Sequence, residues 1–148
     1  RTPLAAAGAA PAVAADAPAP GPSWDRHLAD LGSKDEGIRV DAVSALGATR
    51  DRAVVPHLLP MLEDPNLWVR MSAAKELGAL GDRSAVPALI EALEDERSAV
   101  REEALVALQA LTGETLKFEP HASDSDRAKR VRDWRDWWTK NRERLSQA

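Results

Sequence analysis

The chain has 148 residues and no cysteine, so disulfide scaffolds, thiol catalysis and cysteine-based metal sites are excluded. Its composition is 44% hydrophobic and 30% charged with a net charge of −4, which is ordinary for a globular protein and argues against wholesale disorder. It contains five tryptophans, one phenylalanine and no tyrosine, which disfavours an all-β fold because strands use aromatic and β-branched residues freely.

Residues 1–23 form a compositionally separate segment, rich in alanine and proline. Proline breaks any helix that the alanines start, so we expect an extended, polyproline-like tail. The alternative interpretation is the remnant of an export leader, because Ala15-Asp16-Ala17 fits a small-x-small cleavage pattern. The export-leader interpretation favours a periplasmic or envelope location over a cytoplasmic one. Neither interpretation includes a membrane span, which needs ~20 apolar residues.

From residue 24 onward the sequence repeats itself with a period of 31 residues. Matches at this one shift are dense, and a partial unit precedes the first full one, so the chain is predicted to be a repeat protein. The matched positions include Ile38-Arg39, Val69-Arg70 and Val100-Arg101; Ala42, Ala73 and Ala104; Leu46, Leu77 and Leu108; and Val55-Pro56 with Val86-Pro87.

Each unit is predicted to form two antiparallel helices joined by a short turn. In the second unit, apolar residues at helical spacing run from Val69 to Leu80, Gly78 and Gly81 with Asp82 are expected to break the chain, and Val86-Pro87 begins the second helix. One helix pair cannot bury both apolar stripes, so neighbouring pairs must stack around a shared core. The predicted fold class is therefore an all-α solenoid over residues 24–113.

The second unit resembles HEAT repeats of the short, phycobilisome-lyase type, through Val69-Arg70, Ala73-Ala74, Leu77-Gly78, Gly81-Asp82, Val86-Pro87 and Leu93-Glu94-Asp95. The resemblance implies a polar ladder between units that pairs Asp64 with Arg70 and Asp95 with Arg101. HEAT-like iron hydroxylases carry His-Glu pairs, which this sequence lacks. Related bilin lyases hold a chromophore, usually on a longer array.

Residues 114–148 are predicted to form an irregular linker and a capping helix from about Ser125 to Arg144. Val131, Trp134, Trp137 and Trp138 share one helical face, which would cover the exposed end of the array. The same tryptophan pattern is similar to the terminal segment of many bacterial HEAT-repeat proteins. Stacking of these rings on a ligand is the alternative.

The capping helix is basic, whereas the rest of the chain is acidic. Residues 127–144 hold eight Lys or Arg and three Asp or Glu. Basic residues beside aromatic ones permit a nucleic-acid-binding hypothesis, but an acidic body repels phosphate. We therefore expect these charges to lie on the solvent face and expect no nucleic-acid partner.

No pattern in the sequence indicates catalysis. His27, His57 and His121 lack the spacing of metal ligands, the glycines belong to the repeat turns, and no serine has a recognisable histidine partner. We therefore expect no catalytic site, no cofactor and no metal.

The remaining hypothesis is a binding surface. Trp68 stands on a turn where a polar residue is usual, which marks it as an interface anchor or as packing on the neighbouring unit. In HEAT arrays the second helices line the concave side, where His57, Met61 and Glu91 would form a small groove. Pro60 should kink its helix.

The sequence thus favours a non-enzymatic scaffold or accessory subunit that docks on a larger protein complex through its solenoid surface and its tail. Any membrane association would come through that partner. The alternatives are a lyase-like or chaperone module that handles a prosthetic group, and a nucleic-acid-binding module.

Overall fold

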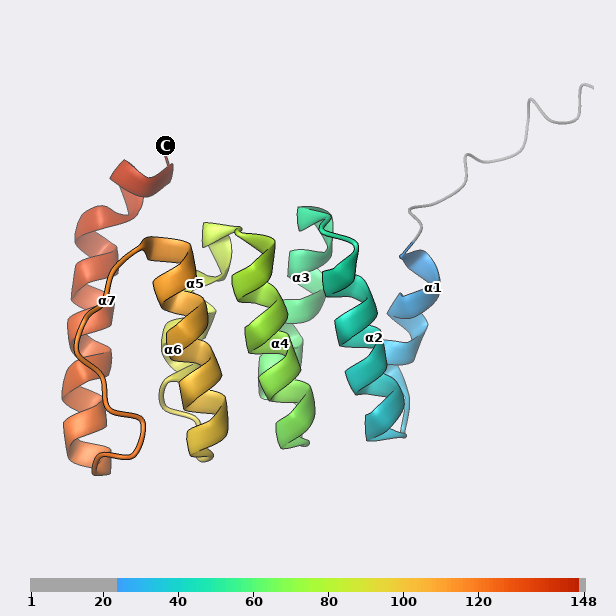
Figure 1. Ribbon diagram of the computed structural model, residues 1–148, viewed down its shortest axis with the longest axis horizontal. Helices are drawn as coiled ribbons and strands as arrows, with labels where there is room; N and C mark the ends of the chain where they lie inside the picture. The colour runs from blue at the N-terminus through green and yellow to red at the C-terminus, as the bar shows by residue number, and fades with distance from the viewer. Residues whose placement is uncertain (1–23, 147–148) are drawn as a thin grey trace, which may run out of the picture.

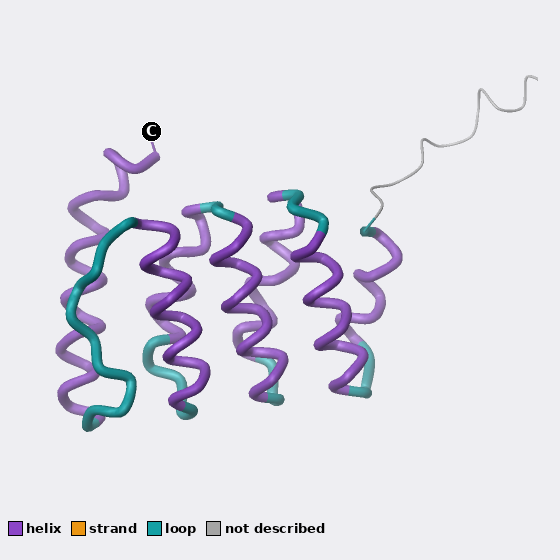
Figure 2. The backbone as a smooth tube through the Cα atoms, viewed as in Figure 1, coloured by secondary structure: helices purple, strands orange, loops and turns teal. Residues whose placement is uncertain are grey.

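The computed structural model describes residues 24–146, and the regular elements of these residues are all helical (Figure 2). Residues 1–23, on which the tail and leader hypotheses depend, and residues 147–148 lie outside the described residues. With η for a 3₁₀ helix, the elements are α1 (Asp25–Leu28), η2 (Ala29–Gly32), α2 (Glu36–Ala48), η3 (Arg52–Val54), α3 (Val55–Leu58), η4 (Leu59–Glu63), α4 (Leu67–Leu80), η5 (Arg83–Ala85), α5 (Val86–Ala92), α6 (Ser98–Thr112) and α7 (Asp124–Ser146).

The helices stack in two layers, as an α-solenoid does (Figure 1). The first helices of the units, α2, α4 and α6, lie side by side in one layer. The second layer holds α1–η2, α3–η4 and α5, and α7 packs against α5 at the C-terminal end. The predicted all-α solenoid is therefore confirmed.

Polar side chains at equivalent positions define where the helices begin. Asp35 and Asn66, 31 residues apart, each accept two main-chain N–H bonds at the start of α2 and α4. Asp51 and Asp82 do the same with one N–H each at η3 and η5. The sequence thus sets these helix boundaries locally in the first two units, whereas Arg97, at the equivalent position before α6, makes no such side-chain bond.

The second helix of the first unit changes type where Pro60 stands. The α-helical segment α3 ends at Leu58, and the chain continues as the 3₁₀ helix η4. Proline has no N–H to give to an α-helical bond. The kink expected at Pro60 therefore takes the form of a change from α to 3₁₀ geometry.

One hydrophobic core runs along the array and is closed by tryptophans at both ends. At the C-terminal end, Val131 and Trp134 of α7 are fully buried, and Trp137 and Trp138 pack against the core from half-buried positions. This is the cap that the sequence predicted, on a helix slightly longer than expected.

Trp24 closes the N-terminal end, a role that sequence analysis missed. Its ring is buried and lies 5.6 Å from that of His57, and its Nε1 donates to the Asp51 carboxylate at 3.0 Å. This hydrogen bond, with that from the Ala53 main chain, lowers the pKa of Asp51. A lone tryptophan before the first repeat gave no periodic signal by which to find it.

Candidate interaction groove

A ladder of three arginines joins the units next to the candidate site. Arg39 and Arg70 each donate bidentately to an aspartate 25 residues later, Asp64 and Asp95, with shortest distances of 2.9 Å. Each also donates to a main-chain oxygen six residues earlier, at 2.8 Å and 2.9 Å. Every such arginine therefore fixes the turn of its own unit to that of the next.

Each aspartate of the ladder pairs with the arginine of the unit before the one that the resemblance implied. Asp64 was expected to pair with Arg70, but its carboxylate binds Arg39, and Arg70 reaches only its main-chain oxygen. The Asp95 carboxylate likewise binds Arg70, while Arg101 donates to the main-chain oxygen of Asp95 at 2.5 Å. The physical reason is that each arginine projects toward the following unit, where the next carboxylate lies.

The surroundings of the ladder arginines shift the pKa values of two of them in opposite directions. The hydrogen bond to Asp64 raises the pKa of Arg39. Arg101, at the end of the ladder, has no equivalent carboxylate partner among residues 24–146, and burial lowers its pKa. Arg39 and Arg101 both remain charged at neutral pH, because an arginine side chain does not lose its proton in proteins.

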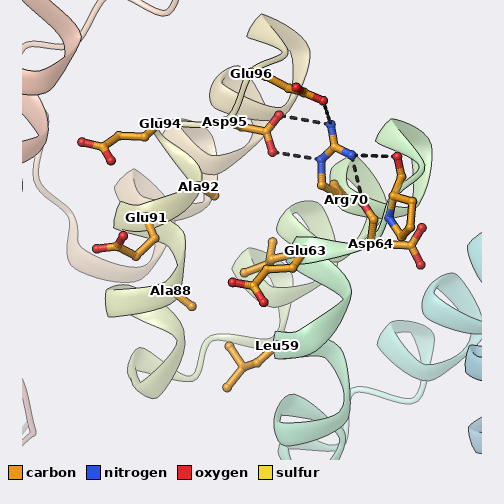
Figure 3. A pocket seen from close by; sticks show the side chains of 12 residues that line it. Leu59, Glu63, Asp64, Arg70, Ala88, Glu91, Ala92, Glu94, Asp95 and Glu96 are labelled. Carbon is orange, nitrogen blue, oxygen red and sulfur yellow. Dashed lines mark hydrogen bonds and ion pairs between the residues drawn. The ribbon is translucent and has the colours of Figure 1, made fainter. Parts of the chain in front are cut away.

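An open groove of about 530 Å³ lies between η4 and α5, beside this ladder (Figure 3). Small and apolar side chains form its floor, and six carboxylates and Arg70 surround it. The floor consists of Leu59, Leu62, Ala88 and Ala92, and the carboxylates are Glu63, Asp64, Glu91, Glu94, Asp95 and Glu96.

The carboxylates of the groove differ in how far they are neutralised. Arg135 of α7 binds Glu91 at 2.7 Å and lies 3.8 Å from Glu94, and both carboxylates point away from the groove centre in Figure 3. Glu96 is 3.7 Å from Arg70, and its side chain is 82% exposed. Glu63 reaches from η4 toward α5 and forms no ion pair within the described part of the chain. The groove therefore keeps a negative potential.

The residues predicted to line one groove are separated in the structure. Glu91 is part of the groove, at its α7 side. His57 lies at the preceding contact against Trp24, and Met61 packs against the core, so neither lines the groove. Sequence analysis missed Glu63 and Glu96, because acidic residues at the ends of helices are also typical of ordinary solvated surface.

Trp68 lies in the first turn of α4, outside the groove, with 61% of its surface exposed. A side chain this exposed does not pack on the neighbouring unit, which was one of the two interpretations of Trp68. A tryptophan so exposed leaves a large apolar surface for a partner.

The histidines of the described residues belong to no cluster that could hold a metal ion. His121 lies 2.7 Å from Glu102, and among residues 24–146 no three histidine, aspartate or glutamate side chains are arranged to hold a metal ion. None of the described helices combines the length and the apolar character that crossing a bilayer requires.

Comparison with known proteins identifies the class. A family model of HEAT repeats matches residues 26–116, more than half of the chain. The chain belongs to the HEAT-repeat family, with a tryptophan-rich capping helix after the repeats.

Among solved structures, the chain is similar to the complex of CpcE and CpcF of phycocyanin lyase from a Nostoc species. The identity is 36% and the TM-score 0.56, over 65% of this chain and 41% of that one. The chain thus spans about two fifths of the length of that relative. No curated protein matches it.

Proposed function

We propose that this chain is a non-enzymatic HEAT-repeat module that docks on a larger protein assembly. The observation that supports this best is the open groove between η4 and α5, which combines an apolar floor with carboxylates. Its lining holds acidic, apolar and arginine side chains, which are the kinds of group that contact another protein. The acidic rim also disfavours phosphate, and with it a nucleic-acid partner.

Trp68 and residues 1–23 are the further contacts of this proposal. Trp68 is the largest exposed apolar side chain on the repeats, and such residues anchor interfaces. The alanine- and proline-rich sequence suits an extended contact along a partner.

The test is co-purification from the source organism with quantitative mass spectrometry. Four chains are compared: the full chain, the chain without residues 1–23, Trp68→Ala, and the control Lys129→Ala on the exposed side of α7. We expect one stoichiometric partner, retained by the control and depleted with Trp68→Ala or without the tail. Recovery of the full chain alone contradicts the proposal.

A second candidate is a module that handles a prosthetic group. The observation in its favour is the similarity to a phycocyanin lyase complex at 36% identity. Visible absorbance in the chain purified from its source, retained through gel filtration, favours this candidate. A colourless chain that still brings down a protein partner favours the first.

A further inference from the structure

The elements of the second layer meet at three successive contacts: α1–η2 with α3–η4, α3–η4 with α5, and α5 with α7. The side chains of the described residues fill the first and the third of these contacts. Trp24 fills the first, with its ring against His57 and its Nε1 on the Asp51 carboxylate. α7 covers the third, with Arg135 on Glu91 and its tryptophans against the core. The second contact is the groove, which nothing in the described residues fills.

The groove is open because two side chains are short. Ala88 and Ala92 face it from α5 (Figure 3). The residues 31 positions earlier are the larger His57, whose ring lies against Trp24, and Met61, which packs against the core. The two alanines of α5 thus present less bulk to the groove than the residues at the equivalent positions of the first unit would.

The two filled contacts share a chemistry. In each, an aromatic surface packs on the second helices while a donor of the same segment reaches a carboxylate: Trp24 Nε1 to Asp51, and Arg135 to Glu91. The open contact offers the same pair of features, an apolar floor beside the carboxylates of Glu63 and Glu96.

We infer that the groove binds a segment of a partner protein in which an aromatic side chain stands next to lysine or arginine. This deepens the proposed function and rests on it. The aromatic ring would cover Ala88 and Ala92, and the cation would pair with Glu63 or Glu96. Charge complementarity supports this occupant, because six carboxylates of the groove face only Arg39, Arg70 and Arg135.

A second copy of this chain fits less well. The basic helix α7, with three tryptophans, already buries Val131 and Trp134 against its own repeats. That helix would bring charge to the groove without a free apolar face.

The test is selection of random 12-residue peptides, displayed on phage, against the immobilised full chain. Enriched sequences are synthesised with a fluorescent label, and their affinity is measured by anisotropy. We expect enrichment of peptides that join an aromatic residue to two or more cations. We also expect the affinity to fall several-fold between 50 and 500 mM salt, because exposed charge pairs are screened.

Two variants locate the binding. Ala88→His with Ala92→Met fills the hollow with the residues of the preceding unit, and we expect a loss of affinity of about tenfold or more. Glu63→Gln with Glu96→Gln removes the charge from two exposed positions without changing the core. This variant should also lose affinity, and it tests the inference if the first variant does not fold. Circular dichroism and thermal melting establish folding, and Lys129→Ala, on the exposed side of α7, is the matched control. Trp68→Ala is measured separately, to show whether the peptides bind at that side chain instead.

The outcomes separate this inference from the proposed function. Peptides without an aromatic–cation pair, or peptides that bind the filled and neutralised variants unchanged, overturn the inference. If those peptides are instead lost with Trp68→Ala, the interaction module stands and only its groove is wrongly assigned. Absence of any enriched peptide also overturns the inference, and co-purification then decides the proposed function.

Discussion

Arg101 donates from its Nε to the main-chain oxygen of Pro120 at 2.8 Å, at the point where Arg39 and Arg70 donate to a carboxylate of the following unit. The third unit has no successor, so the linker before α7 supplies a carbonyl in place of the missing aspartate. The polar ladder thus continues beyond the repeats and attaches the capping segment to the array.

The ladder predicts unequal costs for removing its arginines. Arg70→Ala leaves the half-buried Asp95 carboxylate and two main-chain oxygens without their donor, and we expect a loss of about 3–5 kcal/mol. Arg101→Ala strands only two main-chain oxygens, and we expect about 1–3 kcal/mol. Urea unfolding measures both, and equal losses would contradict this account.

Two glycines 31 residues apart mark where the first helices approach most closely. An ideal Cβ on Gly78 would lie 2.8 Å from the Ala107 main chain, which cannot move aside. An ideal Cβ on Gly47 would overlap the Glu76 carboxylate, at the end of a flexible side chain. We expect Gly78→Ala to cost about 1–3 kcal/mol.

The Gly47 contact is tested by a double-mutant cycle. Glu76 occupies the position that Ala107 takes in the next unit, so Glu76→Ala should remove the obstacle. We expect Gly47→Ala to cost less stability in the Glu76→Ala background than in the native one. Additive effects of the two substitutions in thermal melts would refute a direct contact.

Glu76 also predicts a pH dependence. Burial raises the pKa of its carboxyl above the ordinary 4.5, against the opposing charges of Lys75 and Arg50. The folded state therefore disfavours the ionised form, a cost that is fully present above the folded pKa and absent below the unfolded one. Glu76→Gln should be more stable than the native chain at pH 7.

The stability difference between the Glu76→Gln and native chains should shrink as the pH falls through the folded pKa toward 4.5. Urea midpoints of the two chains, compared at each pH, cancel the titration of other carboxylates. A difference that does not change with pH would show that burial is not its cause.

The tryptophans of the cap and of the surface should respond differently. Trp134 is fully buried, and we expect Trp134→Ala to cost about 3–5 kcal/mol. Its Nε1 has no hydrogen-bond partner in the part of the chain that the structure describes, so Trp134→Phe should cost less. Trp68→Ala, at an exposed position, should stay within about 0.5 kcal/mol by the same urea unfolding. A large loss at Trp68 would argue for a structural role instead of a partner contact.

The sequence by itself determined the fold, because its signals are local and repeated. The period of 31, the stripe from Val69 to Leu80, the break at Gly81 and the start at Val86-Pro87 each depend on neighbours along the chain. The capping face of α7 was readable for the same reason, since Val131 and Trp134 lie one helical turn apart.

Only the tertiary structure decided the groove and the partners of the ladder. Whether Asp64 meets Arg39 or Arg70 depends on the direction in which a side chain leaves one unit toward the next, which periodicity does not encode. The groove is lined by the short side chains of Ala88 and Ala92, whereas the equivalent contact of the preceding unit holds Trp24 against His57. A repeat pattern reports what its units share, whereas a site arises where one unit differs, and packing alone shows whether another part of the chain fills the space.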